Sequence, residues 1–116
     1  MLLGCCIGSS SPSVRELATR MGCSNLTGIG GPPELGVPQR GKCSLGGSPV
    51  LVFTFADGRS QKDWLDATEG FHNYYLVTGK GWAVVPFSRA LELRIQGKLG
   101  GTIIDHAPPP GSPAPL

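Results

Sequence analysis

Charged residues are scarce in this sequence, and their signs nearly cancel. They make up 16% of the 116 residues and leave a net charge of +2, whereas about a quarter of an ordinary protein is charged. The small excess of cations lies before residue 50, and residues 50–106 carry as many acids as bases. A protein gains affinity for nucleic acid through many cationic contacts with phosphates. The composition therefore argues against a DNA-binding protein and against strong phosphate binding in general.

Long apolar runs are also missing. None approaches the ~18 apolar residues that cross a bilayer, so no membrane span is predicted. Residues 1–8 form a short apolar run with no basic residue ahead of it, and no signal peptide is predicted. S-palmitoylation of Cys5 and Cys6 stays open.

The four cysteines form no C-x-x-C motif and match no zinc-binding spacing. They are Cys5, Cys6, Cys23 and Cys43. Free thiols are the usual state of cysteines in a reducing compartment. We therefore predict free thiols and a cytoplasmic location.

Residues for catalysis are few. The two histidines, His72 and His106, have no nucleophile placed beside them by the sequence pattern, and the acidic residues Asp63, Asp66 and Glu69 flank a predicted turn. Solvated acidic loops are common at such places. We assign no catalytic residue, no metal ligand and no cofactor. The alternative is a small metal-binding protein or hydrolase that uses both histidines and the acidic loop 63–69.

Glycine and proline are abundant. The sequence holds 18 Gly and 11 Pro, about twice the ordinary proportion, mostly near the two ends. This distribution predicts a poorly ordered N-terminal arm over 1–49 and a disordered Pro-rich tail over 107–116, with one small domain over 50–106. A domain this short has a modest core. Self-association or binding to a protein partner is therefore expected.

One helix is predicted inside the N-terminal arm, over residues 13–21. Ser13 is a good N-cap, Glu16 stands in the capping-box position, and Gly22 can end the helix. The rest of the arm, residues 22–49, shows no periodicity and is predicted to be a linker.

The region 50–106 has the composition of a β-rich domain, with turn signals about every ten residues. Residues 59–65 are either a second strand or, over 61–67, a helical turn. Residues 90–95 alternate between apolar and charged side chains, which favours a strand. The predicted strands are 50–56, 59–65, 74–78, 82–85, 90–95 and, as a possible sixth, 102–104. Five or six short strands favour a small barrel or sandwich.

The run from residue 50 to residue 95 resembles the Sm-like family, whose fold is a five-stranded SH3-like barrel. An apolar strand ends in Asp-Gly in "FTFADG", 53–58, an Asn precedes an apolar strand in "FHNYYLV", 71–77, and "WAVVPFSRALELRI", 82–95, is similar to the family's final hairpin and strand. The resemblance implies RNA contacts by Asn73, His72 and Arg89. It also implies rings formed by pairing of sheet edges between subunits.

Aromatic residues supply a second set of candidate contacts. Tyr74 and Tyr75 are consecutive, so one of them points outward in a strand, where it could form a contact platform with Trp82. The prediction is thus a non-catalytic binding or assembly module that acts through a sheet edge and exposed aromatics, with a protein or RNA as partner. The candidate binding residues are His72, Asn73, Tyr74, Tyr75, Trp82 and Arg89.

Overall fold

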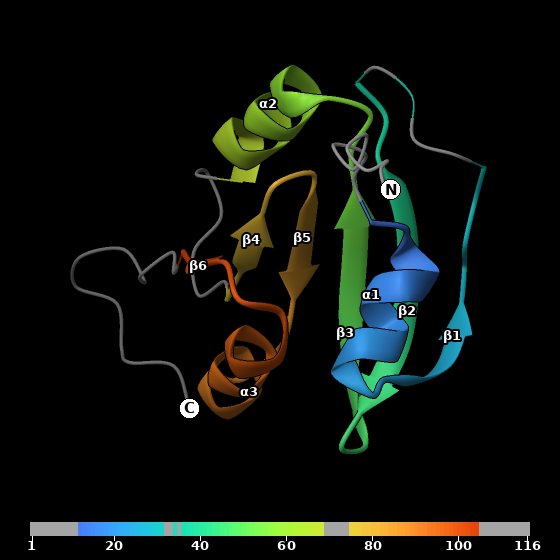
Figure 1. Ribbon diagram of the computed structural model, residues 1–116, viewed down its shortest axis with the longest axis vertical. Coiled ribbons are helices and arrows are strands. Elements are labelled where there is room, and N and C mark those ends of the chain that lie inside the picture. The colour runs from blue at the N-terminus through green and yellow to red at the C-terminus, as the bar shows by residue number, and fades with distance from the viewer. Residues whose placement is uncertain (1–11, 32–33, 35, 69–74, 105–116) are drawn as a thin grey trace, which may run out of the picture.

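The computed structural model describes residues 12–31, 34, 36–68 and 75–104, which form one antiparallel sheet with three helices (Figure 1). The strand order is β1-β2-β3-β5-β4-β6, so β1 and β6 are the two edges of an open sheet. The predicted mainly β class is confirmed. The elements are α1 (Val14–Met21), β1 (Ser24–Thr27), β2 (Gln39–Leu45), β3 (Ser48–Thr54), α2 (Gly58–Thr68), β4 (Val77–Gly79), β5 (Trp82–Val85), α3 (Arg89–Leu99) and β6 (Thr102–Ile103).

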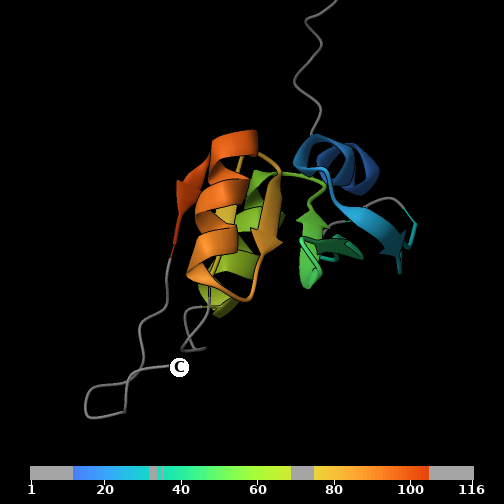
Figure 2. The same cartoon turned by 90° about the horizontal axis from the view of Figure 1, so that it is seen from below.

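Helices cover both faces of the sheet, and each face has its own apolar core. Strand side chains alternate between the faces. Val52 and Val84 belong to the core that α1 and α3 cover, while Phe53 and Val85 belong to the core that α2 covers with Trp64. Figure 2 turns the view by 90° and shows α1 and α3 beside the strands that they cover. None of the helices among the described residues has the length and hydrophobicity to cross a membrane.

The predicted N-terminal helix is confirmed as α1. The Ser13 hydroxyl accepts the Glu16 N–H at 3.0 Å, and Gly22 ends the helix with φ of 77°, a left-handed conformation that glycine adopts without steric cost. Val14 and Leu17 are fully buried against the sheet. Packing against the sheet therefore stabilises a helix that would be marginal alone.

The prediction of an unstructured linker over 22–49 is wrong, because β1 and β2 lie within it. The side chains of β2 alternate, and Gly41, Cys43 and Leu45 face the core beneath α1. A Cβ on Gly41 would lie 2.6 Å from Val14 Cγ1, so the helix can approach this strand only where the strand has no side chain. The glycine that obscures the strand pattern is thus required by the packing.

Two predicted strands are helices. Residues 59–65 lie in α2, as in the helical alternative over 61–67, and residues 90–95 lie in α3. The Ser88 hydroxyl accepts the Leu91 N–H at 3.2 Å and caps α3. Leu91 and Ile95, four residues apart, are buried on one helix face. The alternation that favours a strand depends on Leu93, which the helix leaves exposed.

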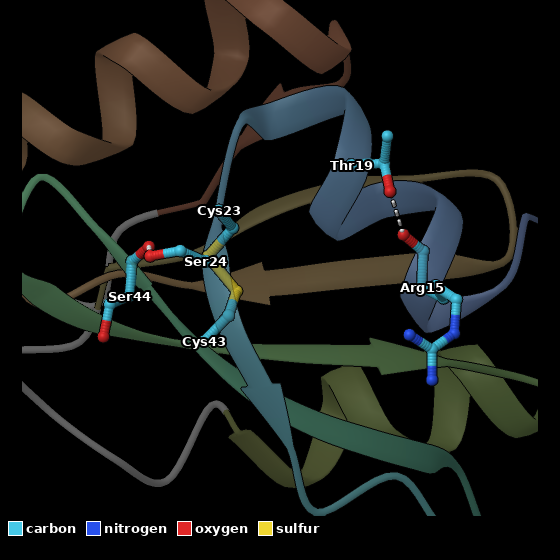
Figure 3. The surroundings of a disulfide bond; sticks show 6 residues. All are labelled: Arg15, Thr19, Cys23, Ser24, Cys43 and Ser44. Carbon is cyan, nitrogen blue, oxygen red and sulfur yellow. Dashed lines mark hydrogen bonds between the residues drawn. A yellow bond between two sulfur atoms is a disulfide. The ribbon is translucent and has the colours of Figure 1, made fainter.

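A disulfide between Cys23 and Cys43 ties the chain after α1 to the middle of β2 (Figure 3). The predicted free thiols are therefore wrong for this pair, and Cys5 and Cys6 lie outside the described residues. Beside the disulfide, the Ser24 hydroxyl donates to the Ser44 carbonyl at 3.3 Å. Disulfides are typical of oxidising compartments, so this bond disfavours the cytoplasmic location, which stays a prediction.

We expect the double variant C23A/C43A to be less stable than the wild type by about 3 kcal/mol, because the crosslink closes a loop of about 20 residues in the unfolded chain. Urea unfolding followed by circular dichroism measures the difference. The matched control is the wild type with a reductant, which should unfold at the same urea concentration as the variant. An unchanged midpoint in both would contradict a stabilising crosslink.

The helix α2 begins at a capping carboxylate. Asp57 Oδ1 accepts the Ser60 N–H at 2.8 Å, and the Asp57 carbonyl accepts the Gln61 N–H at 3.2 Å. The hydrogen bond from the Ser60 backbone holds the pKa of Asp57 below its ordinary value of 3.8. The Asp-Gly pair predicted to be a turn is therefore the N-terminal cap of a helix.

The lowered pKa of Asp57 gives a testable pH dependence. Because its folded pKa lies below its unfolded pKa, Asp57 stabilises the fold above pH 3.8, and this contribution is lost as the pH falls through the lowered value. Asn caps a helix without titrating. The stability advantage of the wild type over D57N should therefore shrink between about pH 5 and about pH 2. Thermal melts at several pH values measure it, and a constant difference would contradict this assignment.

Candidate functional site

The structure describes three of the six predicted binding residues, Tyr75, Trp82 and Arg89. His72, Asn73 and Tyr74 lie outside the described residues, and Tyr75 is half-buried. Trp82 is 6% exposed and belongs to the core under α1 and α3, so its side chain does not form the predicted surface platform.

Trp82 is buried because two glycines make room for its ring. A Cβ on Gly79, its cross-strand partner, would lie 2.5 Å from the indole, and a Cβ on Gly101 would lie 3.0 Å from it. Gly79 in "VTGKGW" therefore has a packing role as well as a turn role, because its lack of a side chain lets the Trp82 ring lie against the strand. An aromatic residue that follows a hairpin glycine can point toward the core or toward solvent. The sequence alone did not distinguish these two orientations.

Polar contacts join α2 to the hairpin between β4 and β5. Gln61 Nε2 donates to Thr78 Oγ1 at 3.0 Å and to the Gly79 carbonyl, and Gln61 Oε1 accepts the Gly81 N–H at 2.8 Å. Thr78 Oγ1 donates in turn to the Trp82 carbonyl at 2.8 Å. This network is structural, because its members bond to one another and fasten α2 to the hairpin.

Two buried threonines provide a matched test of this network. Thr78 Oγ1 is bonded twice, whereas Thr54 Oγ1 is buried without a hydrogen-bond partner among the described residues. We expect T78V to lower the free energy of unfolding by about 1–3 kcal/mol and T54V to raise it by about 1 kcal/mol. Chemical denaturation measures both. Equal effects of the two variants would contradict the network.

The structure describes two of the acidic residues predicted for the alternative metal site. Asp63 and Asp66 are exposed on α2, and Asp66 Oδ2 pairs with Lys62 Nζ at 2.9 Å. His72, His106 and Glu69 lie outside the described residues. Within the part of the chain that the structure describes, no three potential ligands are close enough to hold a metal ion.

Arg89 is exposed at the first turn of α3 and contacts a buried carboxylate. Its Nη1 lies 3.4 Å from Glu92 Oε1. Glu92 has an exposed fraction of 0%, and its Oε2 accepts the Leu76 N–H at 3.1 Å. Glu92 therefore anchors α3 to the chain just before β4, and it fixes which face of α3 points outward.

The outward face of α3 has an apolar centre. At 100° per residue, Ala90, Leu93 and Gly97 lie in one row on the side opposite Leu91 and Ile95. All three are exposed, and Leu93 is 53% exposed. Solvent-facing helix surfaces ordinarily carry polar side chains.

Phe87 lies two residues before the helix begins and is 58% exposed. Arg94 and Lys98 are exposed on the same helix, and its one acid, Glu92, is buried. We call Phe87, Ala90, Leu93 and Gly97 the α3 ridge. Sequence reasoning missed the ridge because it took residues 90–95 for a strand, although Ser88 followed by an i, i+4 pair of apolar residues was a helix signal.

Comparisons with protein-family models, curated proteins and solved structures found no match to the chain.

Proposed function

We propose that this protein is a non-catalytic binding module that docks a protein partner on the α3 ridge. The observation that carries the proposal is the apolar outward face of a helix whose inner face is already buried in the core. Isolated exposed apolar residues are ordinary. Here Leu93 shares a row with Ala90 and Gly97, which leave room for a partner to approach closely, and Phe87 is exposed just before the helix begins.

Aromatic and large aliphatic side chains that are exposed beside small residues resemble the anchors of protein interfaces. Phe87 is the one Phe, Tyr or Trp with an exposed side chain among the described residues. It takes the role predicted for the outward aromatics, and Arg89 from the predicted set lies next to it.

The charges around the ridge indicate which charge the partner carries. The helix layer, α1 with α3, exposes five cations and one acid, Glu16; the cations are Arg15, Arg20, Arg89, Arg94 and Lys98. The opposite helix, α2, exposes more acids than bases once its cap Asp57 is included. A partner segment with an apolar stripe flanked by carboxylates complements both the apolar ridge and the cations around it. An acidic amphipathic helix has this pattern.

A second copy of the chain fits the ridge less well. A symmetric contact between two α3 helices would bring Arg94 and Lys98 toward their own counterparts, and like charges at an interface are unfavourable. The sheet edges offer little for pairing: β6 has two residues, and β1 has four with Asn25 at φ of 58° and an irregular register. Short, irregular edges resist strand addition.

The Sm-like resemblance stays a prediction. Its RNA contacts depended on His72 and Asn73, outside the described residues, and on Arg89. The exposed cations of the helix layer are compatible with RNA, but the apolar centre of the ridge has no favourable contact with a phosphate backbone. A protein partner accounts for both features.

The test uses designed peptides. An 18-residue amphipathic helix with Leu on one face and Glu on its flanks is titrated into the wild type, and binding is measured by fluorescence anisotropy. We expect L93S and the double variant R94E/K98E each to weaken binding about tenfold or more. The same peptide with Lys in place of Glu should not bind.

V37S is the matched control for L93S, because Val37 is 58% exposed and lies on another part of the chain; it should bind the Glu peptide as the wild type does. Absence of binding, or binding that L93S leaves unchanged, would overturn the proposal. So would tighter, Leu93-dependent binding to single-stranded RNA or to anionic vesicles, or a Leu93-dependent dimer in light scattering.

A further inference from the structure

A pocket of about 460 Å³ opens on another part of the molecule, where the connection from β1 meets the start of β2. Its size falls within the range of about 300–1,000 Å³ that is usual for small-molecule sites. Glycine backbone and apolar side chains provide most of the lining. The lining includes Gly30, Gly31, Glu34, Val37, Arg40 and Phe53.

Hydrogen bonds hold the wall of this pocket in place. Gln39 Nε2 donates to the carbonyls of Gly30 and Gly31 at 3.1 and 2.9 Å. Glu34 and Val37 exchange two backbone hydrogen bonds of 2.9 Å each. Just outside the pocket, the Gly36 N–H donates to Ser60 Oγ at 3.0 Å, which fastens the same connection to α2. A wall braced in this way needs little reordering on binding, which favours affinity.

Two opposite charges line the pocket without pairing. Arg40 and Glu34 are both exposed, and neither makes an ion pair with any described residue. Phe53 packs against Trp64 with ring centroids 4.8 Å apart and ring planes tilted by 43°, so a second aromatic ring supports this part of the lining. A planar guanidinium binds a carboxylate through two parallel hydrogen bonds, and a carboxylate binds an ammonium group.

We propose that this pocket binds a small apolar zwitterion, an amino acid or dipeptide with an apolar side chain. Arg40 takes its carboxylate, Glu34 takes its ammonium group, and Val37 with Phe53 contacts the side chain. The site is independent of the α3 ridge, because it shares no residue with it.

The experiment removes one charge from the ligand and one from the protein. The probes are L-phenylalanine, phenylalaninamide, which lacks the carboxylate, and 3-phenylpropionate, which lacks the ammonium group. Each is titrated into the full chain carrying ¹⁵N, and the amide signals of Gly30 and Gly31 report occupancy.

R40Q should weaken phenylalanine and 3-phenylpropionate about tenfold and leave phenylalaninamide unchanged. E34Q should weaken phenylalanine and phenylalaninamide and leave 3-phenylpropionate unchanged. The control K42Q removes a cation two residues along the same strand, outside the pocket lining, and should bind all three probes as the wild type does. Arg40 and Glu34 are exposed, so all variants should melt at the wild-type temperature.

Absence of shifts at Gly30 and Gly31 with all three probes at millimolar concentration would overturn the proposal. Equal weakening of all three probes by R40Q and E34Q would also overturn it, because charge recognition requires the crossed pattern. Binding of phenylalanine that K42Q weakens as much as R40Q does would show attraction by the general positive surface instead.

Discussion

The antiparallel pairing of β3 with β5 is the contact on which the rest of the structure depends. It aligns Leu51 with Val85 and Thr54 with Trp82, residues about 30 positions apart. It joins β1, β2 and β3 to β5, β4 and β6 in one sheet. Because both faces of the paired segment are covered, its apolar residues contribute to one of two cores. The pairing also brings α1 and α3 together on the same face, where they contact each other.

The sequence predicted the elements whose signals are local. Ser13 and Gly22 mark both ends of α1, and the strand predicted over 82–85 is β5. Elements that depend on distant packing were missed. The strand β2 lacks an apolar pattern because Gly41 must lie under Val14, and the pairing of Cys23 with Cys43 depends on β1 lying beside β2.

The error at α3 has a physical cause that bears on function. Leu93 creates an alternating pattern with Leu91 and Ile95, and in the helix it is the member of the three that faces solvent. Solvent-facing positions of a helix ordinarily carry polar side chains, and Leu93 departs from that pattern. Of the predicted site residues, Arg89 is exposed at the start of α3. The sequence could not identify Phe87, because the orientation of this loop depends on the helix that follows.

The crosslink between Cys23 and Cys43 lies wholly on one side of the β3–β5 pairing. The covalent bond therefore holds the segment from α1 to β2, while β4, β5, α3 and β6 are retained by noncovalent packing alone. When heat or mechanical force opens this molecule, the C-terminal half can detach first while the N-terminal half stays looped together. In the detached half α3 would keep its contacts with β4 and β6 but lose those with α1. The apolar surface uncovered in this way would promote aggregation.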